Sequence, residues 1–205
     1  MMSQDLNEEV AAPSRTPANA IDDQTILDAA RDLMATIGIR RTTMADVARA
    51  AQVSRATLYR RYPNVQALAA TVTTREFSAA LASLTPVAGD DTRESLARTV
   101  VHLTSSARSH PLLRRIIELD PEFLIPYLLH RQGRTSSTHL DTLEAAIRAG
   151  QADGSIRTGD PRELASVVLQ AAWSSALSGP VFAGVDGGDL LDSQLFDLVE
   201  RYLRP

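Results

Sequence analysis

Apolar residues recur along most of the chain at the three-to-four spacing that is typical of amphipathic helices. The first such stripe follows Asp23 and ends before Gly38, a residue type that often terminates helices because it adopts the left-handed conformation easily. Stripes of the same period predict further helices in the ranges 64–84, 96–107, 112–117, 140–147, 161–178 and 189–203. No alternation of apolar and polar residues predicts a strand, and the chain has no internal repeat. An all-α fold is therefore expected.

Two short helices are predicted between the first stripe and the one that begins at Asn64. Thr43 can cap the first of them, since Asp46 stands three residues later in the reciprocal capping arrangement. Ser54 can cap the second, which has to end before Pro63 because a proline disfavours the helical conformation of its predecessor. A tight turn joins the pair, and this order of elements predicts a helix-turn-helix.

Turn signals divide the second half of the chain. Gly150, Gly154 and Gly159 are expected to stop a helix, after which Asp160 can cap the next one with Pro161 in its first turn, as in the stretch "AGQADGSIRTGDP". Another proline, at position 126, lies inside the apolar run "PEFLIPYLL". It either kinks or breaks that segment, or marks the place where a helix restarts.

Composition excludes several kinds of site. The chain has no cysteine, so disulfides, thiolate metal sites and thiol nucleophiles are not available. Its four histidines lack the close paired spacing of a helical metal site. The acids Glu118, Asp120 and Glu122 follow His110 and could serve acid–base chemistry, but a solvated helix junction is the simpler interpretation. We expect no catalytic residues, no bound metal and no cofactor.

The start of the chain carries acids rather than a basic segment followed by an apolar run, so a secretory signal is not expected. No apolar run approaches the roughly 18 residues that span a bilayer. A cytoplasmic protein without a membrane partner is therefore predicted.

Charge is distributed unevenly although the net charge is only −4. Residues 38–63 hold six arginines and one acid, Asp46, which gives +5, whereas residues 64–205 hold 13 arginines and 17 acids, which gives −4. An acidic protein can thus present one basic face, and a polyanion would dock there. That face coincides with the predicted helix-turn-helix.

The second short helix, in "VSRATLYRRYPN", has the composition of a helix that enters the DNA major groove with its N-terminal residues against base edges. An arginine can pair with guanine, a small side chain allows close approach or contacts a thymine methyl, and a hydroxyl reaches a base or phosphate. The predicted base-reading residues are Arg55, Ala56 and Thr57.

Further side chains of the same segment can hold phosphates and so position the protein on a duplex. The predicted phosphate contacts are Thr43, Tyr59, Arg60 and Arg61. The alternative is that this short basic helix is only a solvated face and that Tyr59 packs in a small core.

The segment "IGIRRTTMADVARAAQVSRATLYRRYPNVQAL" resembles the DNA-binding region of the TetR family of transcriptional regulators. The matching positions are Gly38, Thr43, Val47, Ala48, Ala51, Val53, Ser54, Leu58, Tyr59, Tyr62 and Leu68. The resemblance is strong from Ile26 to Leu68 and weaker beyond. One departure is Val65, where the family often has a lysine that contacts phosphate at the start of the fourth helix.

The resemblance implies a division of the chain. It makes residues 23–68 a three-helix, helix-turn-helix DNA-binding domain and residues 69–205 a helical ligand-binding and dimerisation domain reached through a long fourth helix. Residues 1–22 are polar and show no sustained period, so we interpret them as a mobile N-terminal tail. The last two long helices would then form the interface of a two-fold homodimer. The residues predicted for that interface are Leu164, Val168, Ala172, Leu191, Leu195, Leu198 and Tyr202.

A pocket in such a domain would have mostly apolar walls. The residues predicted to line it are Leu103, Ile116, Phe123, Tyr127 and Leu143, each of which can also be plain core. Trp173 fits the core of one subunit as well as an interface or a pocket.

The resulting hypothesis is a dimeric regulator, in the first place a repressor, that binds a roughly palindromic operator in double-stranded DNA. A small, largely apolar effector would relieve this binding by shifting the population of dimer geometries. The alternatives are a regulator controlled by a protein partner and, less simply, a helical enzyme. The effector, the operator and the regulated genes cannot be derived from the sequence.

Overall fold

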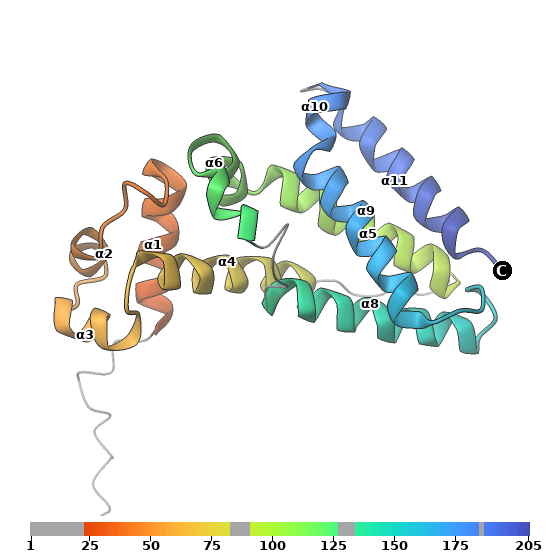
Figure 1. The fold of residues 1–205 in the computed structure, drawn as a ribbon, viewed down its shortest axis with the longest axis horizontal. Coiled ribbons are helices and arrows are strands. Elements are labelled where there is room, and N and C mark those ends of the chain that lie inside the picture. Colours follow the sequence, from red (N-terminus) through yellow and green to blue (C-terminus); the bar gives the residue numbers. More distant parts are fainter. Residues whose placement is uncertain (1–22, 83–90, 127–133, 185–186) are drawn as a thin grey trace, which may run out of the picture.

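Helices make up all the regular structure in the part of the chain that the structure, a computed structural model, describes: residues 23–82, 91–126, 134–184 and 187–205. The helices are α1 (Asp23–Ile37), α2 (Met44–Ala50), α3 (Arg55–Arg61), α4 (Val65–Ala82), α5 (Thr92–Ser109), α6 (Pro111–Leu119), the short 3-10 helix η1 (Pro121–Phe123), α8 (Arg134–Ala152), α9 (Pro161–Leu177), α10 (Gly179–Ala183) and α11 (Gly188–Leu203). The predicted all-α class is confirmed, with α1 to α3 at one end of the molecule (Figure 1).

Local capping bonds define the helix-turn-helix. The Thr43 hydroxyl accepts a hydrogen bond from the Asp46 backbone N–H at 3.1 Å, and the Ser54 hydroxyl accepts one from the Thr57 N–H at 3.0 Å. Each bond satisfies a donor that the first turn of a helix leaves free. Gly38, with φ +86°, ends the preceding helix in the left-handed conformation. The residues that predicted these three helix boundaries therefore also form them, Thr43 and Ser54 through hydrogen bonds and Gly38 through its backbone conformation.

One hydrophobic core holds α1 to α4 together and also takes in α6. Its fully buried side chains include Ile26 and Met34 of α1, Leu58 of α3 and Leu68 of α4. Leu112 and Ile116 of α6 belong to the same buried cluster. The core thus crosses residue 68, the expected end of the N-terminal domain, and ties α6 to the helix-turn-helix unit.

A second core lies between α5, α8, α9 and α11. The buried residues that form its centre are Leu96, Val100, Leu140, Ile147, Leu164, Val168, Leu195, Val199 and Leu203. α4 runs from the first core toward this second bundle and contacts α1 on one side and α8 on the other (Figure 1). A displacement of α4 would therefore change its contacts with α1 in the first core and with α8 in the second bundle.

Three details differ from the expectations or extend them. Gly150 is not a helix stop, because α8 continues to Ala152; it leaves space instead for Ile156, whose Cδ1 would lie 2.4 Å from a Cβ at this position. The chain becomes helical again at Ile125 and Pro126 after α6 and η1 have ended, which favours a restart over a kink at this proline. The five-residue helix α10 has no side-chain cap and was not expected.

Candidate functional site

The N-terminal end of α3 is uncovered by the rest of the described molecule. Arg55 and Ala56 are exposed at its first positions, and Thr57 is half-buried because its backbone and hydroxyl face the Ser54 cap, with 2.8 Å between the two side-chain oxygens. Leu58, on the opposite face, is fully buried and anchors the helix to the first core. One face of α3 is therefore exposed to solvent at Arg55 and Ala56, while the opposite face is packed into the first core through Leu58.

The residues predicted to contact phosphates fall into two groups. Tyr59 is 53% exposed, and Arg60 is exposed beside it on the outer face of α3. Arg61 instead forms an ion pair with Asp23 at the start of α1, with Nη1 2.7 Å from the carboxylate oxygen. Thr43 also has a structural role, since its hydroxyl donates to the Asp46 carboxylate at 2.6 Å while capping α2. These two side chains hold the unit together in the form described here.

Three arginines of the basic segment have no ion-pair partner among the described residues: Arg41, Arg55 and Arg60. Arg40 pairs with Glu122 at 2.9 Å, and Arg49 pairs with Asp46 at 3.1 Å. The pKa of the Asp46 carboxyl is lowered, chiefly by the hydrogen bond from Thr43. Positive charge thus remains unpaired on α3 at Arg55 and Arg60, and in the α1–α2 turn at Arg41, where it can attract a polyanion.

The start of α4 differs from the family pattern in a way that the structure explains. The Asn64 side-chain oxygen accepts a hydrogen bond from the Ala67 N–H at 2.8 Å, so this helix begins with a side-chain cap. Val65 is partly buried and packs against the first core. The position where the resemblance implies a lysine contributes to packing here.

The acidic cluster that follows α6 connects the two parts of the molecule. Asp120 is only 2% exposed, and its carboxylate accepts hydrogen bonds from the backbone N–H groups of Ile39 at 2.6 Å and Arg40 at 3.2 Å. Both donors lie in the turn between α1 and α2. A single carboxylate thus fastens the end of α6 to the helix-turn-helix unit.

The cluster is not arranged for acid–base chemistry with His110. Glu118 pairs with Arg115 at 3.1 Å, and the Glu122 carboxyl has a lowered pKa because Arg40 donates a hydrogen bond to it. His110 faces α4 instead, with Nε2 3.5 Å from the Glu76 carboxylate. These residues therefore form a structural helix junction. The junction was expected to be solvated, but Asp120 is buried.

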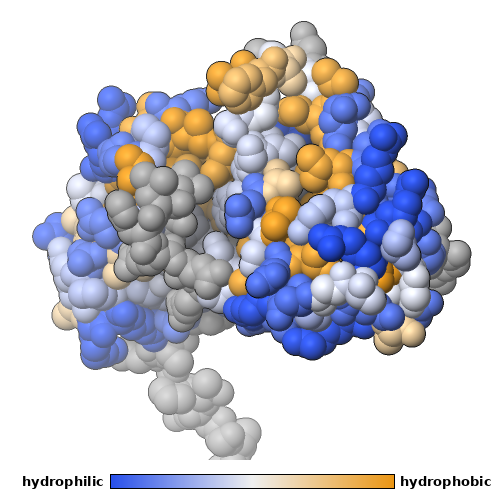
Figure 2. All heavy atoms as spheres, turned by 45° about the vertical axis from the view of Figure 1, so that its right-hand side comes forward, coloured by the Kyte–Doolittle hydropathy of each residue, from blue (hydrophilic) through white to orange (hydrophobic). Residues whose placement is uncertain are grey.

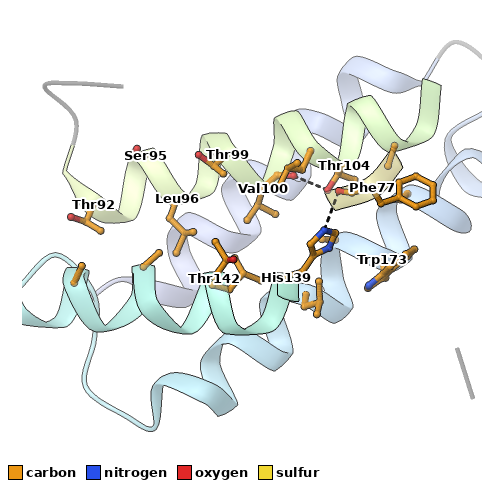
Figure 3. A pocket seen from close by; sticks show the side chains of 18 residues that line it. Phe77, Thr92, Ser95, Leu96, Thr99, Val100, Thr104, His139, Thr142 and Trp173 are labelled. Atoms are coloured by element: carbon orange, nitrogen blue, oxygen red, sulfur yellow. Dashed lines mark hydrogen bonds between the residues drawn. The ribbon is translucent and has the colours of Figure 1, made fainter. Parts of the chain in front are cut away.

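A cavity of about 490 Å³ lies inside the second bundle, between α5, α8 and α9, with Phe77 of α4 at one end (Figure 3). Leu103 and Leu143, two of the predicted lining residues, belong to its wall. Ile116 and Phe123 do not, because α6 and η1 turn these side chains toward α1 and the first core. Tyr127 lies outside the described residues. The volume is typical of a pocket for a small molecule.

His139 and Trp173 were not predicted to line this cavity. The His139 ring is largely buried, which lowers its pKa, and its Nε2 lies 3.4 Å from the Phe77 carbonyl oxygen (Figure 3). A hydrogen bond to that carbonyl needs a proton on Nε2, which leaves Nδ1 as an acceptor in the neutral ring. Trp173 reaches the same end of the cavity from α9.

Acidification should destabilise the protein through His139. Its folded-state pKa is lowered, so below about pH 6.5 the unfolded chain takes up a proton that the folded chain does not, and stability falls as the pH falls through that value. We expect the free energy of unfolding of the natural protein to drop, relative to that of His139→Gln, between pH 7.5 and pH 5.5 in urea titrations. His102→Gln, which alters an exposed histidine of α5, is the control and should follow the natural protein. Parallel curves for the natural protein and His139→Gln would contradict the expectation.

The interface residues predicted from the sequence are mostly internal. Leu164, Val168 and Leu195 are buried in the second core of their own subunit, and Ala172 lines the cavity, because these stripes of α9 and α11 face α5 and α8. Leu191 packs near Gly179, and Tyr202 packs against the second core with its ring 4.7 Å from the Arg157 guanidinium. Of the predicted set, Leu198 is exposed to 50%.

Another stripe of these helices is both apolar and exposed. Val167 of α9 and Leu190 and Leu198 of α11 are exposed, and the adjoining α10 carries Val181 and Phe182, which is 88% exposed. Figure 2 shows hydrophobic surface gathered at the α10 end, with further patches among hydrophilic areas. We refer to these five residues as the outer apolar face.

Comparisons with known proteins agree with this architecture. Residues 26–72 match the sequence profile described as bacterial regulatory proteins, tetR family. An "uncharacterized HTH-type transcriptional regulator" of Mycobacterium bovis is 32% identical over 178 residues, which make up 87% of this chain and 92% of that protein. No helix in the described ranges is long and apolar enough to cross a membrane.

Solved structures show the same fold at lower identity. SmeT, the repressor of the Stenotrophomonas maltophilia multidrug efflux pump SmeDEF, is similar with a TM-score of 0.62 and 21% identity, covering 90% of this chain and 91% of that one. The repressor AlkX from a Dietzia strain is similar with a TM-score of 0.63 and 22% identity, covering 93% of this chain and 97% of that one. Since its helix-turn-helix fits the family profile and a relative matches most of its length, this chain belongs to the TetR family of bacterial transcriptional regulators.

Proposed function

We propose that the protein is a dimeric repressor, which binds a roughly palindromic operator through α3 and releases it when a small, largely apolar ligand occupies the cavity. Residues 23–68 act as the DNA-binding domain and residues 69–205 as the ligand-binding and dimerisation domain. The observation that carries the proposal is the uncovered N-terminal end of α3, with Arg55 and Ala56 exposed and Leu58 fixed in the core. The similar fold of SmeT and AlkX, both named repressors, supports the sign of regulation.

In this proposal Arg55, Ala56 and Thr57 read bases, while Tyr59 and Arg60 contact phosphates from the outer face of α3. Arg61 and Thr43 contribute less, because a phosphate would have to compete with Asp23 for the Arg61 guanidinium and with Asp46 for the Thr43 hydroxyl. The Val65 position makes no charged contact, so the start of α4 adds only its helix N-terminus to phosphate binding. Most of the sequence-independent affinity then depends on Arg41, Arg55 and Arg60.

Replacing Arg55 by alanine should relax the preference at one base pair in each half-site. An arginine that pairs with guanine through two hydrogen bonds discriminates by about 1–3 kcal/mol, which corresponds to roughly 5- to 150-fold per half-site. Selection from random duplexes followed by sequencing measures the change. The matched control is Arg41→Ala, which removes a charge of the same segment and should weaken all sequences alike. An unchanged motif for Arg55→Ala would show that another side chain reads that position.

The homodimer that the family implies would form on the outer apolar face. α9 and α11, which contact each other, expose Val167, Leu190 and Leu198, and α9 and α11 of a second copy would cover these side chains in a four-helix interface. The two α3 helices of such a dimer have to meet successive major grooves about 34–36 Å apart. The end of the molecule that holds α3 lies far from α11, as a dimer of this kind requires (Figure 1).

Two connections can carry the state of the cavity to the helix-turn-helix. The first is α4, where Phe77 lines the cavity while Arg75 forms an ion pair with Asp28 of α1 at 2.9 Å. The second is α6, which follows the cavity-lining helix α5 and ends at Asp120, the carboxylate that holds the α1–α2 turn. A ligand that pushes Phe77 outward would shift α4 and favour a dimer geometry that no longer fits the operator.

A gel-shift assay with DNA from immediately upstream of the protein's own gene tests the proposal. A shifted band that needs the natural α3 and that disappears on addition of a cavity-filling compound is the expected result. A compound that binds the cavity and leaves operator affinity unchanged would remove the ligand-release part of the proposal. Release by a protein partner, with no effect of small molecules, would favour the alternative in which the C-terminal domain is an interaction module.

A further inference from the structure

The cavity has the shape of a channel that follows α5. Its lining residues on this helix recur at every turn: Thr92, Ser95, Leu96, Thr99, Val100, Leu103, Thr104 and Ala107. A rise of 1.5 Å per residue places the first and the last of them about 22 Å apart along the axis. A compact ring system would leave much of such a space empty.

The opposite wall has the same extent. α8 runs beside α5 and lines the channel from His139 to Ala149, and the Thr92 hydroxyl donates to the Asp153 carboxylate just beyond that end. Thr92, Ser95 and Thr99 lie toward one end of the channel, and Phe77, His139 and Trp173 lie toward the other (Figure 3). The two ends therefore differ in chemistry.

No aspartate, glutamate, arginine or lysine lines the channel among the residues that the structure describes. Its centre is formed by Leu96, Val100, Leu103, Leu143 and Leu169. His139, the one titratable group of the described wall, is held toward the neutral state by burial. A charged group against the buried part of this wall, at Leu96, Val100 and Leu143, would lose its hydration without gaining an opposite charge, which is strongly unfavourable. The wall thus selects against ions of either sign.

Two hydroxyl groups remain available for hydrogen bonds with a ligand. Thr104 donates to the Val100 carbonyl oxygen at 2.7 Å, and Thr142 donates to that of Thr138 at 2.9 Å. Ser95 and Thr99, one turn apart on α5, have no side-chain hydrogen bond to any described residue. Together they can donate to and accept from one oxygen atom.

We infer that the effector is an uncharged, elongated, mainly hydrocarbon molecule with one hydroxyl or carbonyl group, which binds with its oxygen at Ser95 and Thr99 and its chain directed toward Phe77 and Trp173. This inference rests on the proposed function, since it names the class of ligand that the cavity accepts. It concerns the cavity alone and does not depend on whether occupancy changes DNA binding.

Trp173 provides a direct test, because it is the only tryptophan of the chain and it lines the channel. The purified full-length protein is titrated with dodecanol, dodecanoate and dodecyltrimethylammonium, and tryptophan fluorescence and calorimetry report binding. Dodecanol should bind at least about tenfold more tightly than either ion. Octanol should bind roughly 200-fold more weakly than dodecanol, at about fourfold per methylene group buried. An ion that binds as tightly as dodecanol, or affinity that does not depend on chain length, would overturn the inference, as would the absence of binding by any probe.

Two sets of variants place the ligand within the channel. Ala146→Phe should abolish binding because Ala146 lines the channel, whereas Ala145→Phe, on the exposed side of the same helix, should leave it within twofold. Thr99→Val keeps the shape of the side chain and removes its hydroxyl, so it should weaken dodecanol binding about three- to tenfold and leave dodecane binding unchanged. Equal effects of the two phenylalanine variants, or equal effects of Thr99→Val on alcohol and alkane, would contradict the placement.

Operator binding is measured with the same probes and separates the two proposals. If dodecanol binds in the channel and the operator complex persists, the ligand class stands and the proposed release fails. If dodecanoate binds more tightly than dodecanol and releases the operator, the release stands and the ligand class fails.

Discussion

Replacing Leu198 by glutamate should give a folded monomer whose proposed dimer dissociates at least about a thousandfold more readily, with loss of operator binding at nanomolar protein. A buried leucine side chain contributes about 1.5–3 kcal/mol, and a two-fold dimer contains two copies of it. The variant also places two negative charges in an apolar contact, which adds an unfavourable desolvation term. Half of each Leu198 side chain is already buried in its own subunit, so the two copies together lose about 1.5–3 kcal/mol of burial, which is about one to two orders of magnitude in the dissociation constant. Desolvation of the two carboxylates, at several kcal/mol each, brings the expected effect to at least about three orders. Sedimentation velocity and fluorescence anisotropy on labelled operator DNA measure the two effects.

Leu198 is suited to this test because it is 50% exposed in the single subunit, so the glutamate has water around it in the monomer. The control is Ile117→Glu on α6, which changes an exposed apolar residue away from the outer apolar face and should remain dimeric. A dimeric Leu198→Glu variant with unchanged melting temperature would place the interface elsewhere, with Val181 and Phe182 of α10 as the next residues to change.

Boundaries of the elements were largely predictable because the interactions that set them are local. Thr43, Ser54 and Asp160 each accept a hydrogen bond from a backbone N–H two or three residues ahead. Such a contact needs only the right residue types at the right spacing, and these are visible in a single sequence. The same holds for Gly38, whose positive φ is a property of its own backbone. The boundaries of the helix-turn-helix could therefore be derived from the sequence.

The direction in which each apolar stripe points was not predictable in the same way. α9 has apolar residues on more than one stripe, and the periodicity alone does not say whether Val168 or Val167 faces the subunit's own core. The structure buries Val168 and leaves Val167 at 42% exposure, so the stripe that is accessible to a second subunit differs from the expected one. Ile116 was likewise assigned to a pocket, although α6 turns it toward α1. These outcomes depend on which helices are neighbours, and the sequence does not contain that information locally.

Polar residues that act across long sequence distances were the most difficult to interpret. Asp120 binds the Ile39 N–H, 81 residues away in the chain, and Arg75 reaches Gln24 across 51 residues. His139 becomes part of the cavity wall only because α8 packs beside the end of α4. The one sequence signal for the junction was the cluster of Glu118, Asp120 and Glu122. This cluster was compatible with acid–base catalysis as well as with a structural helix junction.

Replacing Asp120 by alanine should lower the free energy of unfolding by about 3–5 kcal/mol. The variant removes two hydrogen bonds to a buried carboxylate and leaves the N–H of Ile39, itself a buried residue, without an acceptor. Hydrogen bonds to charged groups contribute about 1.5–3 kcal/mol each, and an unsatisfied buried donor costs about 1–3 kcal/mol. Urea titration followed by circular dichroism measures the loss. The control, Glu122→Ala, removes an exposed partner of Arg40 and should change stability by less than about 1 kcal/mol.

A second substitution tests the same contact from the other side. Gly38 has φ +86°, and a Cβ there would lie 2.7 Å from Oδ2 of Asp120, whereas Gly154 has φ +80° with no atom within 4 Å of such a Cβ. Alanine at Gly154 therefore reports the backbone strain alone, about 1–2 kcal/mol, and the larger loss expected for Gly38→Ala contains the clash with the carboxylate as well. Because Asp120→Ala removes that carboxylate, the double variant Gly38→Ala with Asp120→Ala should lose less stability than the two single losses together. Strict additivity would mean that the loss in Gly38→Ala is backbone strain alone and that the carboxylate does not lie as close to position 38 as the structure places it. Little loss in Asp120→Ala would mean that the connection between α6 and the helix-turn-helix rests on the apolar contacts of Leu112 and Ile116 with α1.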